Sequence, residues 1–377
     1  MMSIRRGRVV VPLVTAAVGV SLAVAGGQAQ AASGAAAAKK PASVVATSVG
    51  SKIAIYAADG SLRSTRTGLE QFALGPGLLA GTSTSTTDKP WTLVGVDPAT
   101  GARKFAVANA RLPVILNDGL RVMFAPDPLG NRDPQSNSVW IREAKGTVRR
   151  VVQFSNGPGL PGYDPKLDGE ATVLGYSVDA AGKTMTIAEG NDLDLFIYDV
   201  FAVDVAKGGV TRVTSGRKSR HPAISPDGKS IAYDHEVGTC GKPYIRASEL
   251  VLATGKHFGT KKTVIKGSCK AWLTQPAWVS PRTVVAYRFA TSGKTRTSDL
   301  VAVDVLTKKM YTLTKVHDVF TAGAGLVNHV VAFQRDSSTT KSVVLTLSIS
   351  SRRGTVSILR SVAVKGEFPL VAGDSRL

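Results

Sequence analysis

The sequence is poor in cysteine, aromatic residues and acidic residues. Its two cysteines are too few for a cysteine-based metal site unless other side chains complete it. Aromatic residues make up 6% of the 377 residues, too few for a surface that stacks nucleic-acid bases, so we expect no nucleic-acid partner. Because 47 lysines and arginines outnumber 27 aspartates and glutamates, the formal net charge is +20. That charge favours anionic partners, although a solvated basic surface without a specific partner would have the same composition.

Several functional motifs are also missing. The sequence contains no Gly-x-Ser-x-Gly nucleophile elbow and no EF-hand loop. It also lacks a Gly-Lys-Ser/Thr phosphate loop in its required form, and sialidase-type Asp-boxes are not evident. Helical periodicity and long apolar runs are absent after the first 31 residues, so we expect no transmembrane segment in the mature chain. The 38 glycines and 18 prolines suit a turn-rich, all-β protein.

The N-terminus has the pattern of an export signal. An apolar stretch over 9–25 precedes the small-x-small cleavage pattern of Ala29 and Ala31. The charged residues before it are Arg5, Arg6 and Arg8. We therefore predict a signal peptide over 1–31, cleaved from a protein that is secreted or held in the cell envelope. The Arg5–Arg6 pair suggests twin-arginine export, but its flanking residues fit the general secretory route better.

A retained membrane anchor is the competing interpretation of this segment, with an apolar stretch at the short limit for spanning. No cysteine lies near the cleavage site, so lipid attachment is not expected. The alanine-rich residues 32–43 are predicted to be a flexible tether. The remaining residues, 44–377, are then predicted to form a single domain.

The clearest local pattern lies in residues 222–233. Pro222-Ala223-Ile224 predicts a short strand, and Ser230-Ile231-Ala232-Tyr233 predicts the next one. The intervening Ser225-Pro226-Asp227-Gly228-Lys229 has turn chemistry, because proline presets φ, aspartate bonds the backbone and glycine accepts a positive φ. The stretch resembles the β-propeller repeat of the TolB family, whose copies carry Pro-x-x-Ser-Pro-Asp-Gly-Lys-x-Ile-Ala. The resemblance implies a β-propeller, a scaffold that serves many functions.

Paired β-branched runs recur along the rest of the chain. Seven hairpins have centres near residues 55, 97, 141, 204, 252, 304 and 347, and spacings of about 42–63 residues are typical of four-stranded propeller blades. A second kind of hairpin, equivalent to 222–233, alternates with them. Its other copies are expected at 275–287, 174–187 and 114–124, with weaker versions at 320–333 and 72–83.

These repeats predict an all-β fold, a β-propeller of four-stranded antiparallel blades. Six or seven blades fit the spacing; we prefer seven, although TolB-like propellers have six. Residues 368–372 are expected to complete the first blade, whose hairpin spans 52–65, because a propeller must close by pairing its chain ends. A solenoid or two stacked β-sandwiches is the alternative architecture.

The long connections of such blades would emerge on one face. They are expected at 125–137, 156–171, 189–194, 235–247, 291–298 and 336–341. Long loops on a rigid frame often carry binding residues. Cys240 and Cys269 fall in connections of this face, so we predict a disulfide between them in an exported chain. Closing a loop of about 29 residues would stabilise the fold by roughly 3–4 kcal/mol, and the bridge would either rigidify that face or merely staple one blade.

Histidines, carboxylates and arginines are expected to gather on the same face. His221 is predicted at the start of an innermost strand near the channel mouth, and the other residues in or beside the loops. The candidate binding residues are Arg220, His221, His235, Glu236, Asp192, Asp194, Arg288, His317 and Asp318. Such a cluster could hold a divalent metal or act as acid and base, but no pair has close ligand spacing, and ordinary surface polar residues give the same pattern.

Two function classes fit this organisation. The first is a monomeric binding module that contacts an envelope protein or an anionic cell-wall polymer through its long-loop face, without a cofactor or catalytic residue. The alternative is a metal-supported hydrolase or lyase of lactonase type, with a divalent metal in the channel mouth. Both follow by analogy with the fold, since propellers host either kind of function.

Overall fold

The computed structural model describes most of the chain after residue 42. The described residues are 43–49, 52–57, 62–75, 77–83, 90–127, 138–154, 171–191, 198–240, 246–292, 295–316, 319–325, 329–335, 341–350, 355–365 and 371–373. They all belong to the second of two compact units, Met1–Lys40 and Pro41–Leu377. The predicted signal peptide and nearly all of the predicted tether lie outside them. No helix within the described residues has the length and apolarity needed to cross a membrane.

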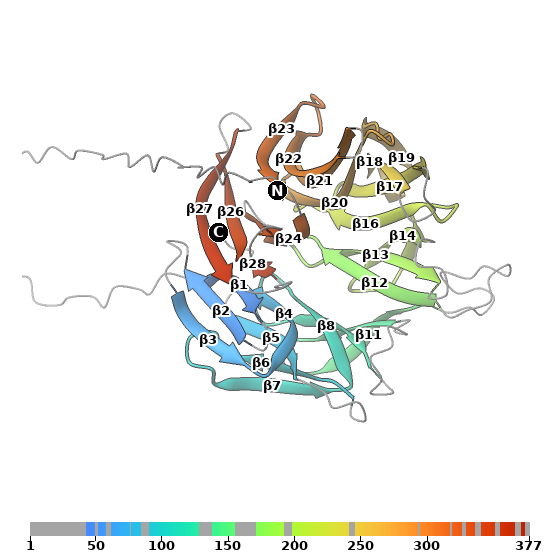
Figure 1. The fold of residues 1–377 in the computed structure, drawn as a ribbon. Coiled ribbons are helices and arrows are strands. Elements are labelled where there is room, and N and C mark those ends of the chain that lie inside the picture. The colour runs from blue at the N-terminus through green and yellow to red at the C-terminus, as the bar shows by residue number, and fades with distance from the viewer. Residues whose placement is uncertain are drawn as a thin grey trace, which may run out of the picture. The chain divides into compact units, whose positions relative to one another are not determined.

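The described residues form seven antiparallel sheets of four strands each (Figure 1). Sheet 1 consists of β28 (Val371–Gly373), β1 (Ser43–Val49), β2 (Lys52–Ala57) and β3 (Leu62–Thr67). Sheet 2 consists of β4 (Leu69–Gly75), β5 (Leu78–Ser83), β6 (Thr92–Val96) and β7 (Arg103–Ala108). Sheet 3 consists of β8 (Ala110–Ile115), β9 (Val122–Pro126), β10 (Ser138–Arg142) and β11 (Val148–Gln153).

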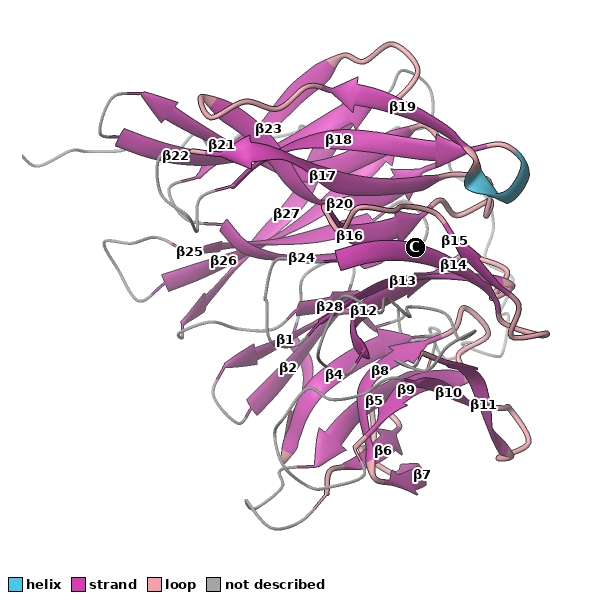
Figure 2. Ribbon diagram, turned by 90° about the vertical axis from the view of Figure 1, so that its right-hand side faces the viewer, coloured by secondary structure: helices cyan, strands magenta, loops and turns pink. Residues whose placement is uncertain are grey.

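The remaining four sheets follow in chain order. Sheet 4 consists of β12 (Ala171–Val178), β13 (Thr184–Asn191), β14 (Tyr198–Asp204) and β15 (Val210–Arg212). Sheet 5 consists of β16 (Ser219–Ile224), β17 (Ile231–Thr239), β18 (Arg246–Thr254) and β19 (Thr260–Ile265), with the short helix η1 (Lys256–Phe258) between the last two (Figure 2). Sheet 6 consists of β20 (Ala271–Ser280), β21 (Thr283–Ser292), β22 (Thr295–Asp304) and β23 (Met310–Val316). Sheet 7 consists of β24 (Val319–Gly325), β25 (His329–Arg335), β26 (Lys341–Ser350) and β27 (Thr355–Lys365).

The turns at one end of the sheets form where the sequence predicts them. Ser225 N donates to Ser230 O at 2.7 Å, and Gly228 N donates to Ser225 O at 2.9 Å, with Gly228 at φ 71°. The same turn recurs at Gly119 and at Gly182, both of which have positive φ. We call this end of each sheet the turn end, and the opposite end, where β17 joins β18, the loop end.

Adjacent sheets pack face to face through apolar side chains. Leu250 and Leu252 of sheet 5 pack with Leu273, Trp278 and other buried residues of sheet 6. Trp278 Nε1 donates to Ala223 O at 2.9 Å, which satisfies the polar atom of a tryptophan that is otherwise buried. Similar apolar clusters join sheets 1 and 2, 2 and 3, 3 and 4, and 4 and 5.

The last strand of the chain closes the series of sheets. β28 pairs with β1 in the register Val45–Gly373, Ala46–Ala372 and Thr47–Val371, and it also contacts β24 and β4 (Figure 1). The first sheet therefore combines both ends of the domain, as the sequence predicts. The sequence did not predict β1, which lies between the closing strand and the hairpin of β2 and β3.

An aspartate begins the outer turn of several sheets. Asp304 Oδ1 accepts hydrogen bonds from Leu306 N and Thr307 N, each 3.0 Å long. Its Oδ2 accepts from Arg282 Nε at 2.8 Å, and Arg282 Nη2 lies 2.7 Å away. The Arg282 hydrogen bond is the main reason that the pKa of Asp304 falls from 3.8 to about 2, with the backbone N–H groups helping.

This pKa predicts an acid-labile contribution to stability. The unfolded chain takes up the Asp304 proton at a higher pH than the folded chain, so the contribution is present above about pH 4 and disappears as the pH falls to about 2. Asp304→Asn keeps the turn acceptor but removes the charge. We expect the variant to unfold at lower urea concentration than the parent near neutral pH, with the difference vanishing near pH 2. A difference that is constant with pH would contradict this assignment.

Candidate functional site

Five of the nine predicted binding residues lie within the described part of the chain, and four lie outside it. Asp192, Asp194, His317 and Asp318 lie outside the described residues. His221 lies in β16 near the loop end, where the sequence predicts it, and Arg220 precedes it in the same strand.

His235 and Glu236 were expected in a loop, and this expectation is wrong. Both lie within β17, which continues to Thr239 because its polar residues still pair with β18, His235 with Glu249 and Glu236 with Ser248. The connection to β18 therefore begins at Cys240 rather than at His235. Arg288 likewise lies within β21, where it pairs with Asp299 of β22.

The two cysteines form the predicted disulfide. Cys240 follows β17 and Cys269 precedes β20, and their Cα atoms lie 5.2 Å apart. Thr291 Oγ1 also donates to Cys269 O at 2.9 Å. The bridge ties the loop end of sheet 5 to the segment that leads into sheet 6.

A buried carboxylate organises the loop end between these two sheets. Asp234 is 1% exposed, and its Oδ1 lies 2.8 Å from His221 Nδ1. Its Oδ2 accepts from Thr274 Oγ1 at 3.0 Å and lies 3.8 Å from Arg220 Nε. We call Arg220, His221, Asp234 and Thr274 the Asp234 cluster. Because the carboxylate holds Nδ1 of a half-exposed imidazole, the cluster fixes the orientation of a histidine whose other edge faces outward.

A backbone bulge brings His221 to this position. The register between β16 and β17 gains one residue between Arg220 and Ala223, and His221 adopts φ 47°. Equivalent bulges occur in β4, β8 and β20, with positive φ at Gln71, Leu112 and Gln275. Bulges re-aim side chains at strand ends, and among these four positions only His221 carries an ionisable group.

Other buried acids near the loop end are also paired internally. Asp199, 3% exposed, accepts from Arg212 and from Thr214 Oγ1. Asp299 accepts a hydrogen bond from Arg288 Nη2. Each of these acids is paired with an arginine of its own sheet.

A polar groove runs between sheets 4 and 5. It has a volume of about 260 Å³ and contains His235. His235 Nδ1 shares a hydrogen bond with Ser219 Oγ, and the two atoms are 3.0 Å apart. Glu249 accepts from Thr263 Oγ1 at 3.0 Å on the same side of sheet 5. Burial, together with the charge of Glu249, raises the pKa of Tyr233 to about 12, so its hydroxyl stays protonated. We call this the side groove. Its other lining residues are Thr214, Ser215, Val251, Lys261 and Lys262.

The outer edge of sheet 5 is strongly basic. Residues 250–298 contain nine lysines and arginines and no aspartate or glutamate. We call the exposed lysines of this stretch the lysine edge; they are Lys256, Lys261, Lys262, Lys266 and Lys270. None of the five forms an ion pair within the described part of the chain. The acid-free stretch is visible in the sequence and could have identified this edge.

Two cations on other outer strands form ion pairs with acidic residues. Lys104 of β7 lies 3.5 Å from Asp97, and Arg149 of β11 lies 2.9 Å from Glu143. Charged residues commonly protect exposed sheet edges from pairing with other chains. That role explains Lys104 and Arg149, but it does not require that Lys261 and Lys262 of β19 form no ion pair among the described residues.

Comparison with solved structures identifies the fold. The β-propeller domain of the Trilobed protease from Pyrococcus furiosus aligns with a TM-score of 0.51 at 12% identity, over 78% of this chain and 95% of that one. The protein is a β-propeller. The β-propeller fold that the 222–233 motif predicts is thereby confirmed, and the described residues supply seven four-stranded blades.

Two further propeller-containing proteins show the range of functions that the fold supports. An oligogalacturonate lyase in complex with manganese aligns with a TM-score of 0.54 at 14% identity, over 84% of each chain. The tricorn protease aligns with a TM-score of 0.56 at 9% identity, over 86% of this chain. This chain spans about a third of the tricorn protease, 35%. No family model and no curated protein sequence matches the chain.

Within the described residues, no group of three or more histidine, cysteine, aspartate or glutamate side chains could hold a metal ion. The Asp234 cluster offers one carboxylate, one imidazole and one guanidinium, which suits recognition of an anion or proton transfer.

The Asp234 cluster makes a direct stability prediction. Asp234→Ala leaves Arg220, whose side chain is 15% exposed, without its carboxylate, so we expect a loss of about 3–5 kcal/mol in unfolding free energy. His221→Ala removes a half-exposed partner and is expected to cost less than about 1 kcal/mol. Urea denaturation of both variants measures the contrast. Equal losses would show that Asp234 does not hold Arg220 in place.

Proposed function

We propose that the protein is an exported propeller that binds an anionic polymer of the cell envelope through the lysine edge and the adjoining side groove. The observation that carries the proposal is that no lysine of the lysine edge forms an ion pair within the described residues, whereas Lys104 of β7 and Arg149 of β11 do. Unpaired ammonium groups on an exposed strand produce a field that attracts polyanions. Lys261 and Lys262 also line the side groove, so the two features form one surface.

Two observations support an extracytoplasmic location. The Cys240–Cys269 disulfide is typical of oxidising compartments. The N-terminal sequence has the charged region, apolar stretch and cleavage pattern of a signal peptide. An exported basic protein meets polymers that carry phosphate or carboxylate groups, and it acts as a monomer in this proposal.

The test compares two variants that remove the same charge from different outer strands. Lys261→Gln/Lys262→Gln acts at the lysine edge, and Arg149→Gln/Arg150→Gln acts at the exposed end of β11. We expect the first pair to weaken binding to polyglycerol phosphate or polygalacturonate by about tenfold to thirtyfold, since each contact with an anionic surface contributes about 1 kcal/mol. The second pair should change it by less than about threefold. Sedimentation with purified polymer, repeated across salt concentrations, measures both.

Three outcomes would overturn the proposal. Equal loss in both variants would show that net charge alone drives binding. Binding that does not weaken as salt rises would exclude an electrostatic mode. Retention of an envelope protein but of neither polymer would identify a protein partner instead. Dextran, a neutral polymer, is the control and should not bind.

An enzyme is the second candidate function, and one observation favours it. His221, held by Asp234 and next to Arg220, could move a proton beside a bound anion. A metal-supported lyase or hydrolase requires a divalent ion in addition. Metal analysis of the mature protein, with activity measured before and after chelation, separates the two functions: turnover that chelation abolishes would replace the binding module by an enzyme.

A further inference from the structure

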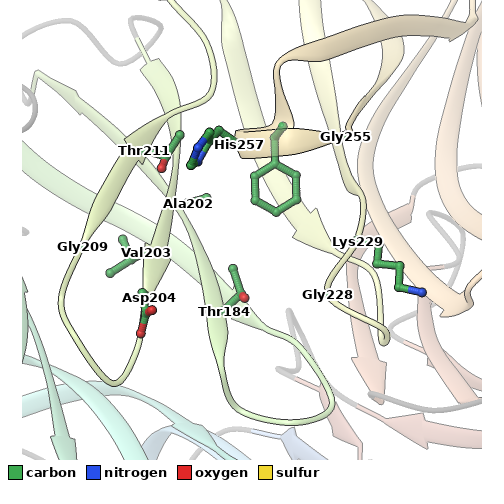
Figure 3. A pocket seen from close by; sticks show the side chains of 11 residues that line it. Thr184, Ala202, Val203, Asp204, Gly209, Thr211, Gly228, Lys229, Gly255 and His257 are labelled. Carbon is green, nitrogen blue, oxygen red and sulfur yellow. The ribbon is translucent and has the colours of Figure 1, made fainter.

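A second pocket opens at the turn end, away from the Asp234 cluster (Figure 3). It lies between sheets 4 and 5 and has a volume of about 530 Å³, within the range of small-molecule sites. Its walls come from β13, from β14 with the turn into β15, and from the turns at Gly228 and Gly255. The lining residues are Thr184, Ala202, Val203, Asp204, Gly209, Thr211, Gly228, Lys229, Gly255, His257 and Phe258.

The backbone of η1 is strained where it borders this pocket. His257 and Phe258 adopt φ 54° and 55°. Two successive residues other than glycine seldom adopt this left-handed conformation. Tight hairpin turns of this kind favour Asn-Gly, which would remove the strain. The sequence has an imidazole and a phenyl ring there instead, and both line the pocket. Local strain that persists at a pocket is a reason to look for function.

The groups that line the pocket are suited to a polyhydroxylated ring. Phe258 is half-buried and packs against the apolar cluster of sheets 4 and 5, so its ring is held in place. Asp204 uses Oδ1 for both of its turn bonds, to Ala206 N and Lys207 N, which leaves Oδ2 as an acceptor. Thr184 and Thr211 contribute hydroxyl groups, and nothing lies within 4 Å of the space that a Cβ on Gly209 would fill.

We propose that this pocket binds a neutral saccharide of one or two rings. An aromatic face covers the apolar side of such a ring, while a carboxylate and hydroxyl groups satisfy its hydroxyls. The pocket is lined by one negatively charged side chain, Asp204, and by one lysine, Lys229. Because these two charges are opposite, the pocket does not select strongly for an anion. The site thus differs in ligand charge from the lysine edge, whose Lys256 precedes His257 in η1, and it goes beyond the proposed function.

The test mixes the full mature chain with three neutral disaccharides: maltose, cellobiose and diacetylchitobiose. Saturation-transfer NMR detects binding, and titration measures the affinity. We expect at least one to bind with an affinity that salt does not change. Phe258→Leu keeps apolar packing but removes the ring and should weaken that binding roughly fivefold to tenfold. Asp204→Asn keeps the turn but removes the charged acceptor and should weaken it by about tenfold.

Two further variants separate binding from folding. Asp97→Asn alters an equivalent turn in sheet 2, where Asp97 Oδ1 accepts from Ala99 N and Thr100 N, and should leave saccharide binding unchanged. His257→Gly relieves the left-handed backbone, so we expect an unchanged or higher melting temperature together with weaker binding. A purely structural role for His257 would instead lower the melting temperature and leave binding intact, which would count against the site.

The proposal is overturned if none of the three disaccharides binds. It is also overturned if binding survives Phe258→Leu and Asp204→Asn, or if a carboxylated disaccharide from hyaluronan binds more tightly than the neutral ones. Polymer binding through the lysine edge is measured separately and should not respond to Phe258→Leu. The failure of either idea can therefore be recognised without the other.

Discussion

Pairing of β28 with β1 is the constraint on which the remaining structure depends. An open series of seven sheets would expose the inner strand of the first blade and one face of the last. The three residue pairs between Val45–Thr47 and Val371–Gly373 remove that edge with strands from opposite ends of the domain. Each sheet then has a neighbour on both faces, and the positions of all inner strands are set by the closure.

The closed arrangement explains where the charged groups lie. Because adjacent sheets pack face to face, Asp199 of β14 and Asp234 of β17 are buried at the loop end and need charged or polar partners. They take Arg212 and Arg220. Outer strands remain accessible to solvent, and β19 contains Lys261 and Lys262 but no acid of its own. Part of the chain's excess positive charge therefore lies on the outside of sheet 5, in an acid-free stretch of the sequence.

Local chemistry in the sequence predicts much of the fold. The Ser225–Lys229 turn, the alternation of two hairpin types and the pairing of Cys240 with Cys269 all depend on residues that are close in sequence or on a repeating order. β1 was missed because its small and hydroxyl-bearing residues, Ser43–Val49, resemble a tether as much as a strand. His235 and Glu236 were assigned to a loop for a similar reason, since it is pairing with Glu249 and Ser248 of β18 that holds them in the strand.

The candidate sites were harder to predict than the fold. Whether a lysine is paired depends on which strand lies beside it. The sequence predicts neither the ion pair of Lys104 with Asp97 nor that Lys261, in a groove with Glu249, forms none among the described residues. The left-handed backbone of His221 and His257 is equally hidden, because bulges and strained turns follow from register. His221 was found because it directly precedes the 222–233 repeat; the turn-end pocket has no such motif.

Hydrogen exchange of the amides in β1 and β28 tests the closure most directly. If their pairing holds the seven sheets together, Val45, Thr47 and Val371 should exchange only through global unfolding, with the same dependence on denaturant as the core of β17. Rapid exchange at these three residues while β17 stays protected would contradict the account, because the blades would then be stable without the strand that closes them.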